Sequence, residues 1–355
     1  MAKIETKFWK GKRVLITGHS GFKGSWLSKV LIQKKARVFG LSLKPKLKRN
    51  LYYDLNLSKD IDEIFVNILN KRKYDDFVNK VNPDIIFHLA AQPLVIDSII
   101  EPELTFKTNI LGTYNILDNF KSNRNSKVCI IVTSDKCYEN NKMNEKFNEN
   151  SKLGGDDPYS SSKACAELII NSFRKTFIEN KFNKKLSSVR AGNVIGGGDW
   201  GNYRIIPDLM YSIFENKKIK IRNKKSLRPW QHVLDCINGY LILAEKMYHS
   251  NNFNGPWNFG PKIRKEITVE NLIEDTHKFF NIPINRDKIE FGINVHNEVK
   301  KLSLNAKKSN TQLNWFPKMN YNTALRSTLD WYKNFYNKSN MEKYSIKQIK
   351  DYYSI

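Results

Sequence analysis

Apolar runs and amphipathic stretches alternate along the first 190 residues of the chain. Short segments, most of them apolar, predict strands at 12–17, 37–43, 84–92, 127–132 and 186–190, of which 127–132 is a β-branched run. Segments of helical period predict helices at 25–33, at 105–120 and from Pro158 onward. The charged segment 47–72 shows only a short possible strand near 65–68. This alternation predicts an α/β fold with a mostly parallel, doubly wound sheet of the Rossmann type.

The pattern loosens after about residue 193, where arginines and aromatic residues are mixed with loop residues. Such a mixture suits a lid over a substrate, because arginine binds phosphate in bidentate geometry. We expect a cofactor-binding domain at 1–192 plus about 230–258. A smaller, partly interleaved substrate-binding domain is expected at about 193–229 and 259–340. Residues 341–355 are expected to form a C-terminal tail or a terminal helix.

A glycine-rich turn joins the first predicted strand to the first predicted helix. Gly18, Gly21 and Gly24 have Gly-x-x-Gly-x-x-Gly spacing. In this position glycines let the backbone approach a pyrophosphate, and the following helix N-terminus favours an anion. The turn therefore predicts a dinucleotide site. Lys44 stands where an acidic residue normally binds the adenosine ribose, so the sequence leaves NAD and NADP both open.

Five residues are candidates for catalysis. Ser134, Asp135 and Lys136 follow the fourth predicted strand, at the sheet edge where ligands bind in open α/β folds. Tyr159 and Lys163 are four residues apart and share one helix face. An ammonium beside a phenol should lower the pKa of the tyrosine towards that of a general base. Asp135 and Lys136 could be a polar loop pair, but their setting favours catalysis.

Charge and composition narrow the choice of partners. The net charge of +25 permits nucleic-acid binding, but lysines are scattered along the whole chain and no basic arm stands out. We therefore expect no nucleic-acid partner, although a basic surface would attract a diphosphate. No apolar run approaches the ~20 residues of a membrane span, and the N-terminus lacks a signal-peptide core. A cytoplasmic protein without a membrane partner is expected. The four cysteines lack metal-ligand spacing, so no metal is expected.

Several motifs occur together in an order that resembles the extended short-chain dehydrogenase/reductases acting on nucleotide sugars. These are the glycine turn, His88–Gln92, Thr133–Lys136, Tyr159 with Lys163, and Arg190–Asn193. Longer segments are similar to the CDP-glucose 4,6-dehydratase family, over nearly the whole chain. They are Gly18–Leu27, Ala91–Val95, Ser134–Tyr138, Asn193–Trp200 and Arg228–Val233.

The resemblance implies a redox-neutral dehydration of CDP-glucose with NAD as cofactor. The sugar would be oxidised at C4, lose water across C5–C6 and regain hydride at C6. Tyr159 would take the 4-hydroxyl proton, Ser134 would hydrogen-bond that oxygen, and Lys163 would hold the nicotinamide ribose. Asp135 would be the acid and Lys136 the base of the elimination, although the roles of this pair stay open. Related dehydratases commonly carry Glu at the position of Lys136, and a lysine base must be neutral.

The resemblance also implies binding residues. The cofactor candidates are Gly18, Gly21, Phe22, Lys23, Gly24, Asn67, Ile68, Leu89, Ala90, Ala91, Gln92, Asn109, Thr133, Tyr159 and Lys163. The substrate candidates are Asn193, Gly198, Asp199, Arg204, Arg228 and His232. The chain departs from the family pattern at Asn67, where the family has Asp, and at Lys44.

Related enzymes pair two helices into a four-helix bundle, which here correspond to 109–120 and 159–177. We therefore expect a homodimer or homotetramer. Three alternatives remain: a 4,6-dehydratase of another nucleotide sugar, such as a GDP-linked hexose or heptose, a nucleotide-sugar 4-epimerase, and a non-catalytic Rossmann module that binds RNA. The pairing of Asp135 with Lys136 argues against the epimerase.

Overall fold

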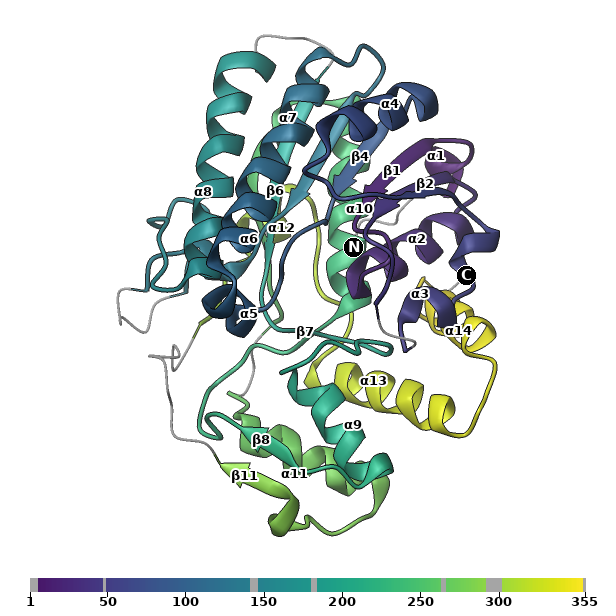
Figure 1. Cartoon of the computed structure of the whole chain (residues 1–355), viewed down its shortest axis with the longest axis vertical. Coiled ribbons are helices and arrows are strands. Elements are labelled where there is room, and N and C mark those ends of the chain that lie inside the picture. The colour runs from purple at the N-terminus through teal and green to yellow at the C-terminus, as the bar shows by residue number, and fades with distance from the viewer. Residues whose placement is uncertain are drawn as a thin grey trace.

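A seven-stranded parallel sheet forms the centre of the protein (Figure 1). The structure, a computed structural model, describes residues 6–46, 49–140, 146–179, 184–262, 266–291 and 302–353. The strand order β10-β6-β5-β4-β1-β2-β3 places β1 near the middle, with the chain winding outward on both sides. The expected doubly wound α/β fold is confirmed.

The five inner strands of this sheet match the strands expected from the sequence, and β3 and β10 are added at its two edges. The strands are β1 (Arg13–Thr17), β2 (Arg37–Ser42), β3 (Asp62–Phe65), β4 (Ile85–His88), β5 (Val128–Val132), β6 (Lys185–Ala191) and β10 (Gly255–Phe259). Side chains alternate between the two faces, so Leu15 joins one apolar cluster while Val14 and Ile16 join the other. Because helices cover both faces, the central strands are apolar on both sides.

Helices pack on each face of the sheet (Figure 1). One cluster joins the sheet to α1 (Thr6–Trp9), α2 (Phe22–Gln33) and α10 (Val233–His249). The other joins it to α4 (Lys71–Val81), α7 (Gly112–Ser122) and α8 (Pro158–Phe173). The helix expected at 105–120 is instead assembled from α6 (Pro102–Phe106), a π-helical turn at Lys107–Leu111 and α7. Such π-turns often mark functional sites.

A smaller group of elements lies beyond one end of the sheet, in the lower part of Figure 1. It contains α9 (Ile205–Glu215), β8 (Ile219–Ile221), α11 (Val269–Phe280), β11 (Ile289–Phe291) and α13 (Tyr321–Tyr336). The short strands β7 (Val194–Ile195) and β9 (Gln231–His232) pair between this group and the sheet. Shorter helices are α3 (Leu51–Asp54), α5 (Val95–Ile100), α12 (Lys307–Gln312), the π-turn Arg174–Ile178 and the 3-10 turns Leu57–Lys59, Asp135–Cys137, Asn251–Phe253 and Arg286–Lys288.

The C-terminal segment is a packed helix, α14 (Met341–Tyr353), rather than a loose tail. Lys29 of α2 forms an ion pair with Glu342, with 2.6 Å between Nζ and Oε1. Further along α14, the Tyr352 hydroxyl donates to Asp235 Oδ1 of α10 at 2.7 Å. The helix therefore anchors the C-terminus to the helices beneath the sheet. Within the described ranges, no helix combines the length and apolar composition that crossing a bilayer would require.

Two adjacent tyrosines of α14 provide a matched test of this anchoring. Tyr352 hydrogen-bonds to the buried Asp235, whereas the buried Tyr353 hydroxyl has no partner among the described residues. We expect Tyr352→Phe to lower the free energy of unfolding by about 1–2 kcal/mol, because it removes a hydrogen bond from a buried carboxylate. Tyr353→Phe should be neutral or slightly stabilising. Urea unfolding of both variants measures the difference, and equal losses would contradict the anchoring role.

Candidate active site

The glycine turn lies at the carboxyl edge of the sheet, against the end of β4. Gly18 has φ +76°, and a Cβ there would lie 2.6 Å from the Ala90 backbone nitrogen. A Cβ on Gly24 would lie 2.1 Å from the Gly18 carbonyl oxygen. Gly21 precedes α2 with extended backbone and no side-chain cap, so no side chain occupies the first amides of the helix. This tight turn fits the pyrophosphate of a dinucleotide.

Residues at and beyond the ends of β2 and β3 would lie beside the adenosine half of such a cofactor. Lys44 is exposed beyond β2. An acidic residue, Glu63, lies on the next strand, β3, where it bonds to His19 Nε2 at 2.6 Å and accepts from the Tyr52 hydroxyl. Asn67 is exposed and its Oδ1 accepts from the Leu69 amide at 2.9 Å. The side chain of Asn67 thus stabilises its own loop.

The segment after β5 forms a short 3-10 turn that presents its polar residues at the same edge. The Ser134 hydroxyl accepts from the Lys136 amide at 3.2 Å and donates to Asp135 Oδ1 at 3.1 Å. Ser134 and Asp135 are buried, and Lys136 is half-buried. A Cβ on Gly192 would lie 2.8 Å from Asp135 Oδ2, so the end of β6 forms a close wall beside this carboxyl group.

The helix α8 brings Tyr159 and Lys163 to Ser134. Asp157 caps the helix by accepting from the Ser160 amide at 2.9 Å. Tyr159 lies near enough to Ser134 for the serine side chain to lower the pKa of the phenol, and Lys163 Nζ donates to the Val132 carbonyl oxygen at 3.5 Å. The structure therefore brings the predicted serine, tyrosine and lysine together.

The pKa of Tyr159 differs from the value expected from the sequence. Burial raises this pKa to about 12, although Ser134 and the charge of Arg204 act in the opposite direction. The cation that lowers the pKa of Tyr159 is thus Arg204 rather than the expected Lys163, and desolvation of the phenolate outweighs it. Burial, followed by the charge of Lys23, lowers the pKa of Lys163 to about 8.

Burial also changes the proton affinity of Asp135. Burial raises the pKa of its carboxyl group, while Lys136, Ser134, Lys23 and Arg228 oppose that shift. A carboxyl group with a raised pKa holds its proton more readily near neutral pH. Lys23 was expected at the site as part of the glycine turn, and its charge acts on both Asp135 and Lys163.

Several substrate candidates lie beside the cofactor candidates. Arg204 Nη1 pairs with Asp199 Oδ2 at 2.6 Å, and its charge reaches Tyr159. A pocket of about 190 Å³ joins the glycine turn to the segment after β7. Its lining residues are Phe22, Arg49, Asn50, Leu51, Pro93, Leu94, Gly198, Asp199, Trp200, Gly201 and Arg204. Arg228 acts electrostatically on Asp135, so it also belongs to this region.

Other candidate residues form hydrogen bonds that hold neighbouring elements of the site in place. His232 is fully buried, and its Nδ1 accepts from the Leu234 amide at 3.2 Å, which caps α10. The Asn109 amide donates to Ser162 of α8 at 2.8 Å, and its Oδ1 accepts from the Gln92 amide at 2.8 Å. The Gln92 side chain turns back to the Leu94 carbonyl. Asn193 is half-buried and its carbonyl oxygen accepts from the Gln231 amide. These contacts give His232, Asn109, Gln92 and Asn193 roles in positioning the backbone.

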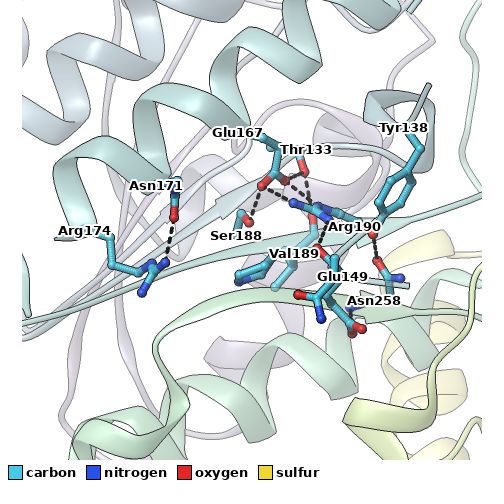
Figure 2. A network of polar contacts seen from close by, with 12 residues as sticks. Thr133, Tyr138, Glu149, Glu167, Asn171, Arg174, Ser188, Val189, Arg190 and Asn258 are labelled. Carbon is cyan, nitrogen blue, oxygen red and sulfur yellow. Dashed lines mark hydrogen bonds and ion pairs between the residues drawn. The ribbon is translucent and has the colours of Figure 1, made fainter. Parts of the chain in front are cut away.

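The sequence analysis missed a buried ion pair under the site, between Glu167 of α8 and Arg190 of β6 (Figure 2). Thr133, predicted to contact the cofactor, donates its hydroxyl hydrogen to Glu167. Glu167 lies four residues after Lys163, and Arg190 lies within a strand. The signal available in the sequence was a charged residue in each buried element, because a buried charge requires a partner.

Comparisons with known proteins identify the family of this chain. The family model described as GDP-mannose 4,6 dehydratase matches residues 15–328. CDP-glucose 4,6-dehydratase of Salmonella typhimurium is 38% identical over 99% of both chains. dTDP-D-glucose 4,6-dehydratase of Dictyostelium discoideum is 30% identical, covering 77% of this chain and 62% of the relative.

Solved structures share the fold. UDP-glucose 4-epimerase of Thermotoga maritima superimposes with a TM-score of 0.79 at 21% identity, covering 91% of this chain and 99% of the epimerase. dTDP-glucose 4,6-dehydratase of Streptomyces venezuelae, solved with NAD, has a TM-score of 0.79 at 18% identity, covering 92% and 98% of the respective chains. From the family model and the full-length relative, the chain belongs to the GDP-mannose 4,6-dehydratase family of nucleotide-sugar dehydratases.

Proposed function

We propose that this protein is a CDP-glucose 4,6-dehydratase that forms CDP-4-keto-6-deoxy-glucose. The observation that carries this proposal is the position of Asp135 and Lys136 beside Ser134 and Tyr159 at one edge of the sheet. An oxidation site alone would need the serine and the tyrosine, whereas an elimination also needs an acid and a base. The full-length similarity to a CDP-glucose 4,6-dehydratase supports the choice of substrate.

NAD is the cofactor of the proposed reaction, and its site is formed by residues of this chain. The backbone amides of the glycine turn would hold the pyrophosphate, with Phe22, Leu89, Ala90 and Lys163 bordering the rest. When bound, NAD supplies reversible hydride exchange with the sugar carbons. The tight contact of Gly18 with Ala90 supports this assignment, because it leaves backbone rather than side chains facing the anion.

Ser134 and Tyr159 would act in the first step, in which the proton of the sugar 4-hydroxyl is removed. The 4-hydroxyl of the sugar would hydrogen-bond to Ser134 and transfer its proton to Tyr159 acting as the phenolate. Since burial holds the pKa of Tyr159 at about 12, the surrounding cations have to favour the phenolate. Arg204 already does so from the substrate side. Lys163 orients the ribose from the opposite side.

Asp135 and Lys136 handle the elimination. The raised pKa of Asp135 suits donation of a proton to the departing C6 hydroxyl. At the same time Lys136 takes the C5 proton, which the neighbouring 4-ketone makes acidic. Placing these two residues on one 3-10 turn keeps the acid and the base together beside the same sugar ring.

The group of α9, β8, α11, β11 and α13 would bind the nucleotide sugar, with residues 193–229 and 259–340 as its domain. Residues 1–192 and about 230–258 would form the cofactor domain. Arg204 and Arg228 are the proposed diphosphate ligands, because both act electrostatically on groups of the reaction centre. Asp199 holds Arg204 in position before the phosphate arrives.

A homodimer is proposed through the helices on the α8 side. Exposed apolar side chains gather on α5, α6, α7, α8 and the adjoining π-turns. They are Ile99, Ile100, Leu104, Phe106, Leu111, Tyr114, Leu168 and Phe177. Burying such a surface against a second copy would remove it from water.

The first test is turnover of nucleotide sugars. Purified protein should convert CDP-glucose to a product lighter by one water, measured by mass spectrometry, because the site holds both elimination groups. UDP-, dTDP- and GDP-sugars in parallel reactions test the choice of base. Loss of water from a different nucleotide sugar would keep the reaction and replace the substrate. No loss of water from any of them would overturn the dehydratase proposal.

A second test addresses the base. Lys136→Ala should slow water loss by about 10²–10⁴-fold, the usual contribution of a general base. Lys136→Glu is the matched control, since it restores a base at this position and should recover part of the rate. The rate of dehydrated product formation measures both variants. Near-normal turnover by Lys136→Ala would remove Lys136 from the mechanism.

The proposed dimer can be tested with two equally exposed leucines. Leu168 on α8 is 57% exposed and belongs to this apolar surface. Leu43, beyond β2, is 58% exposed and lies outside it. We expect Leu168→Glu to produce monomers, because it places a charge in the interface, while Leu43→Glu leaves the assembly unchanged. Light scattering after gel filtration gives the mass of each. A dimer that persists in Leu168→Glu would place the interface elsewhere.

A further inference from the structure

A buried ion pair joins Glu167 of α8 to Arg190 of β6, and Thr133 and Tyr138 lie beside it (Figure 2). Arg190 Nε donates to Glu167 Oε1 at 2.9 Å, and Nη2 donates to Oε2 at 2.7 Å. Both side chains are only 3% exposed. Burying two charges costs several kcal/mol per ion before their attraction is counted, so the pair is weak evidence of a purely stabilising role.

Each charged group is surrounded by further partners. Glu167 Oε1 accepts from the Thr133 hydroxyl, and Oε2 accepts from the Ser188 hydroxyl at 2.7 Å. Arg190 Nη1 donates to the Tyr138 hydroxyl at 2.7 Å and to the Glu149 carbonyl at 3.3 Å. Burial raises the pKa of Glu167, but Arg190 and the hydrogen bonds outweigh it and keep this pKa low. The carboxylate therefore stays charged near neutral pH.

The partners of this pair have a particular place in the sequence. Thr133 immediately precedes the segment 134–137, and Tyr138 immediately follows it. The pair thus holds both ends of the turn that carries Ser134, Asp135 and Lys136. Glu167 lies one turn beyond Lys163 on the same face of α8. One ion pair therefore connects the elimination residues to the helix that carries Tyr159 and Lys163.

We propose that Glu167 and Arg190 are positioning residues, which fix the turn 134–137 relative to α8. The inference rests on the proposed dehydratase activity, in which groups on both elements must meet one sugar ring. Displacement of a reacting group by about 1 Å can cost about 10²-fold in rate. The pair restrains this displacement because its hydrogen bonds leave neither end of the turn free to shift.

Two buried hydroxyls allow this role to be separated from general stability. Thr133 and Ser188 both donate to the Glu167 carboxylate and are both at most 6% exposed. Only Thr133 is attached to the catalytic turn, whereas Ser188 lies in β6. Thr133→Val removes the hydrogen bond between Glu167 and the turn with little change in side-chain volume. Ser188→Ala removes the hydrogen bond between Glu167 and β6, which does not involve the turn. Thr133→Ser retains the hydroxyl and serves as the rescue variant.

The expected result is a selective loss of turnover. Thr133→Val should lower kcat for dehydration of CDP-glucose by about tenfold or more, with KM within about twofold, because the turn moves while the substrate domain is intact. Its kcat–pH profile should also shift, since Asp135 would change its surroundings. Ser188→Ala should keep both kcat and the profile, and Thr133→Ser should recover most of the kcat that Thr133→Val loses. Thermal unfolding should give similar midpoints for Thr133→Val and Ser188→Ala.

Other outcomes identify which statement fails. Equal losses of kcat in Thr133→Val and Ser188→Ala, or an unshifted pH profile in Thr133→Val, would mean that the pair only holds the fold. No dehydration by the unaltered protein would instead reject the proposed function. Glu167→Gln and Arg190→Lys should show larger losses than Thr133→Val. The hydroxyl variants remain the decisive comparison if a charge variant does not fold.

Discussion

Burial of ionisable groups at the carboxyl edge of the sheet governs the chemistry of this protein. Among the described residues Asp135 and Lys163 form no ion pair, and burial shifts the pKa values of Asp135, Tyr159 and Lys163 in the direction that favours the neutral forms. Glu167 and Arg190 are as deeply buried but are paired, and both remain charged. The same low-polarity environment therefore prepares one set of groups for proton transfer and holds the other set as a fixed support.

This division also explains the position of the ion pair. A neutral hydrogen-bond network would be weaker, and a single buried charge would be too costly. A paired carboxylate can accept several hydrogen bonds at once, which lets one side chain on α8 bind to β5 and β6 together. The parallel sheet makes this possible, because β5 and β6 are neighbours whose ends both lie beneath α8.

The strands at the centre of the sheet could be predicted from the sequence, whereas the two edge strands could not. The five strands expected from the sequence are all present, because strands covered on both faces are rich in apolar residues, although β6 also buries Ser188 and Arg190. The edge strand β10 contains Gly255, Pro256 and Asn258, and an edge strand tolerates such residues. The opposite edge strand, β3, is only partly buried and charged, which leaves no apolar run. The π-turn within 105–120 was missed because its sequence keeps an ordinary helical pattern.

For the candidate site, the sequence predicted which residues meet but not how their surroundings act on them. The spacing of Tyr159 and Lys163 and the position of Ser134 after a strand were enough to predict that they meet, because regular elements fix those directions. The pKa of Tyr159 was predicted in the wrong direction, since burial depends on residues distant in sequence. The inward turn of Thr133 towards Glu167 depends on the same distant contacts.

The fold by itself does not select the reaction. An epimerase and a dehydratase superimpose on this chain equally well, with TM-scores of 0.79. In the proposed mechanism, the feature that makes this chain a dehydratase is the short turn after β5, which places Asp135 and Lys136 beside the residues for oxidation. Because both groups sit on one turn, the chemistry depends on how firmly that turn is held. Selection among reactions on this scaffold therefore acts on the turn and on the residues that bind its two ends.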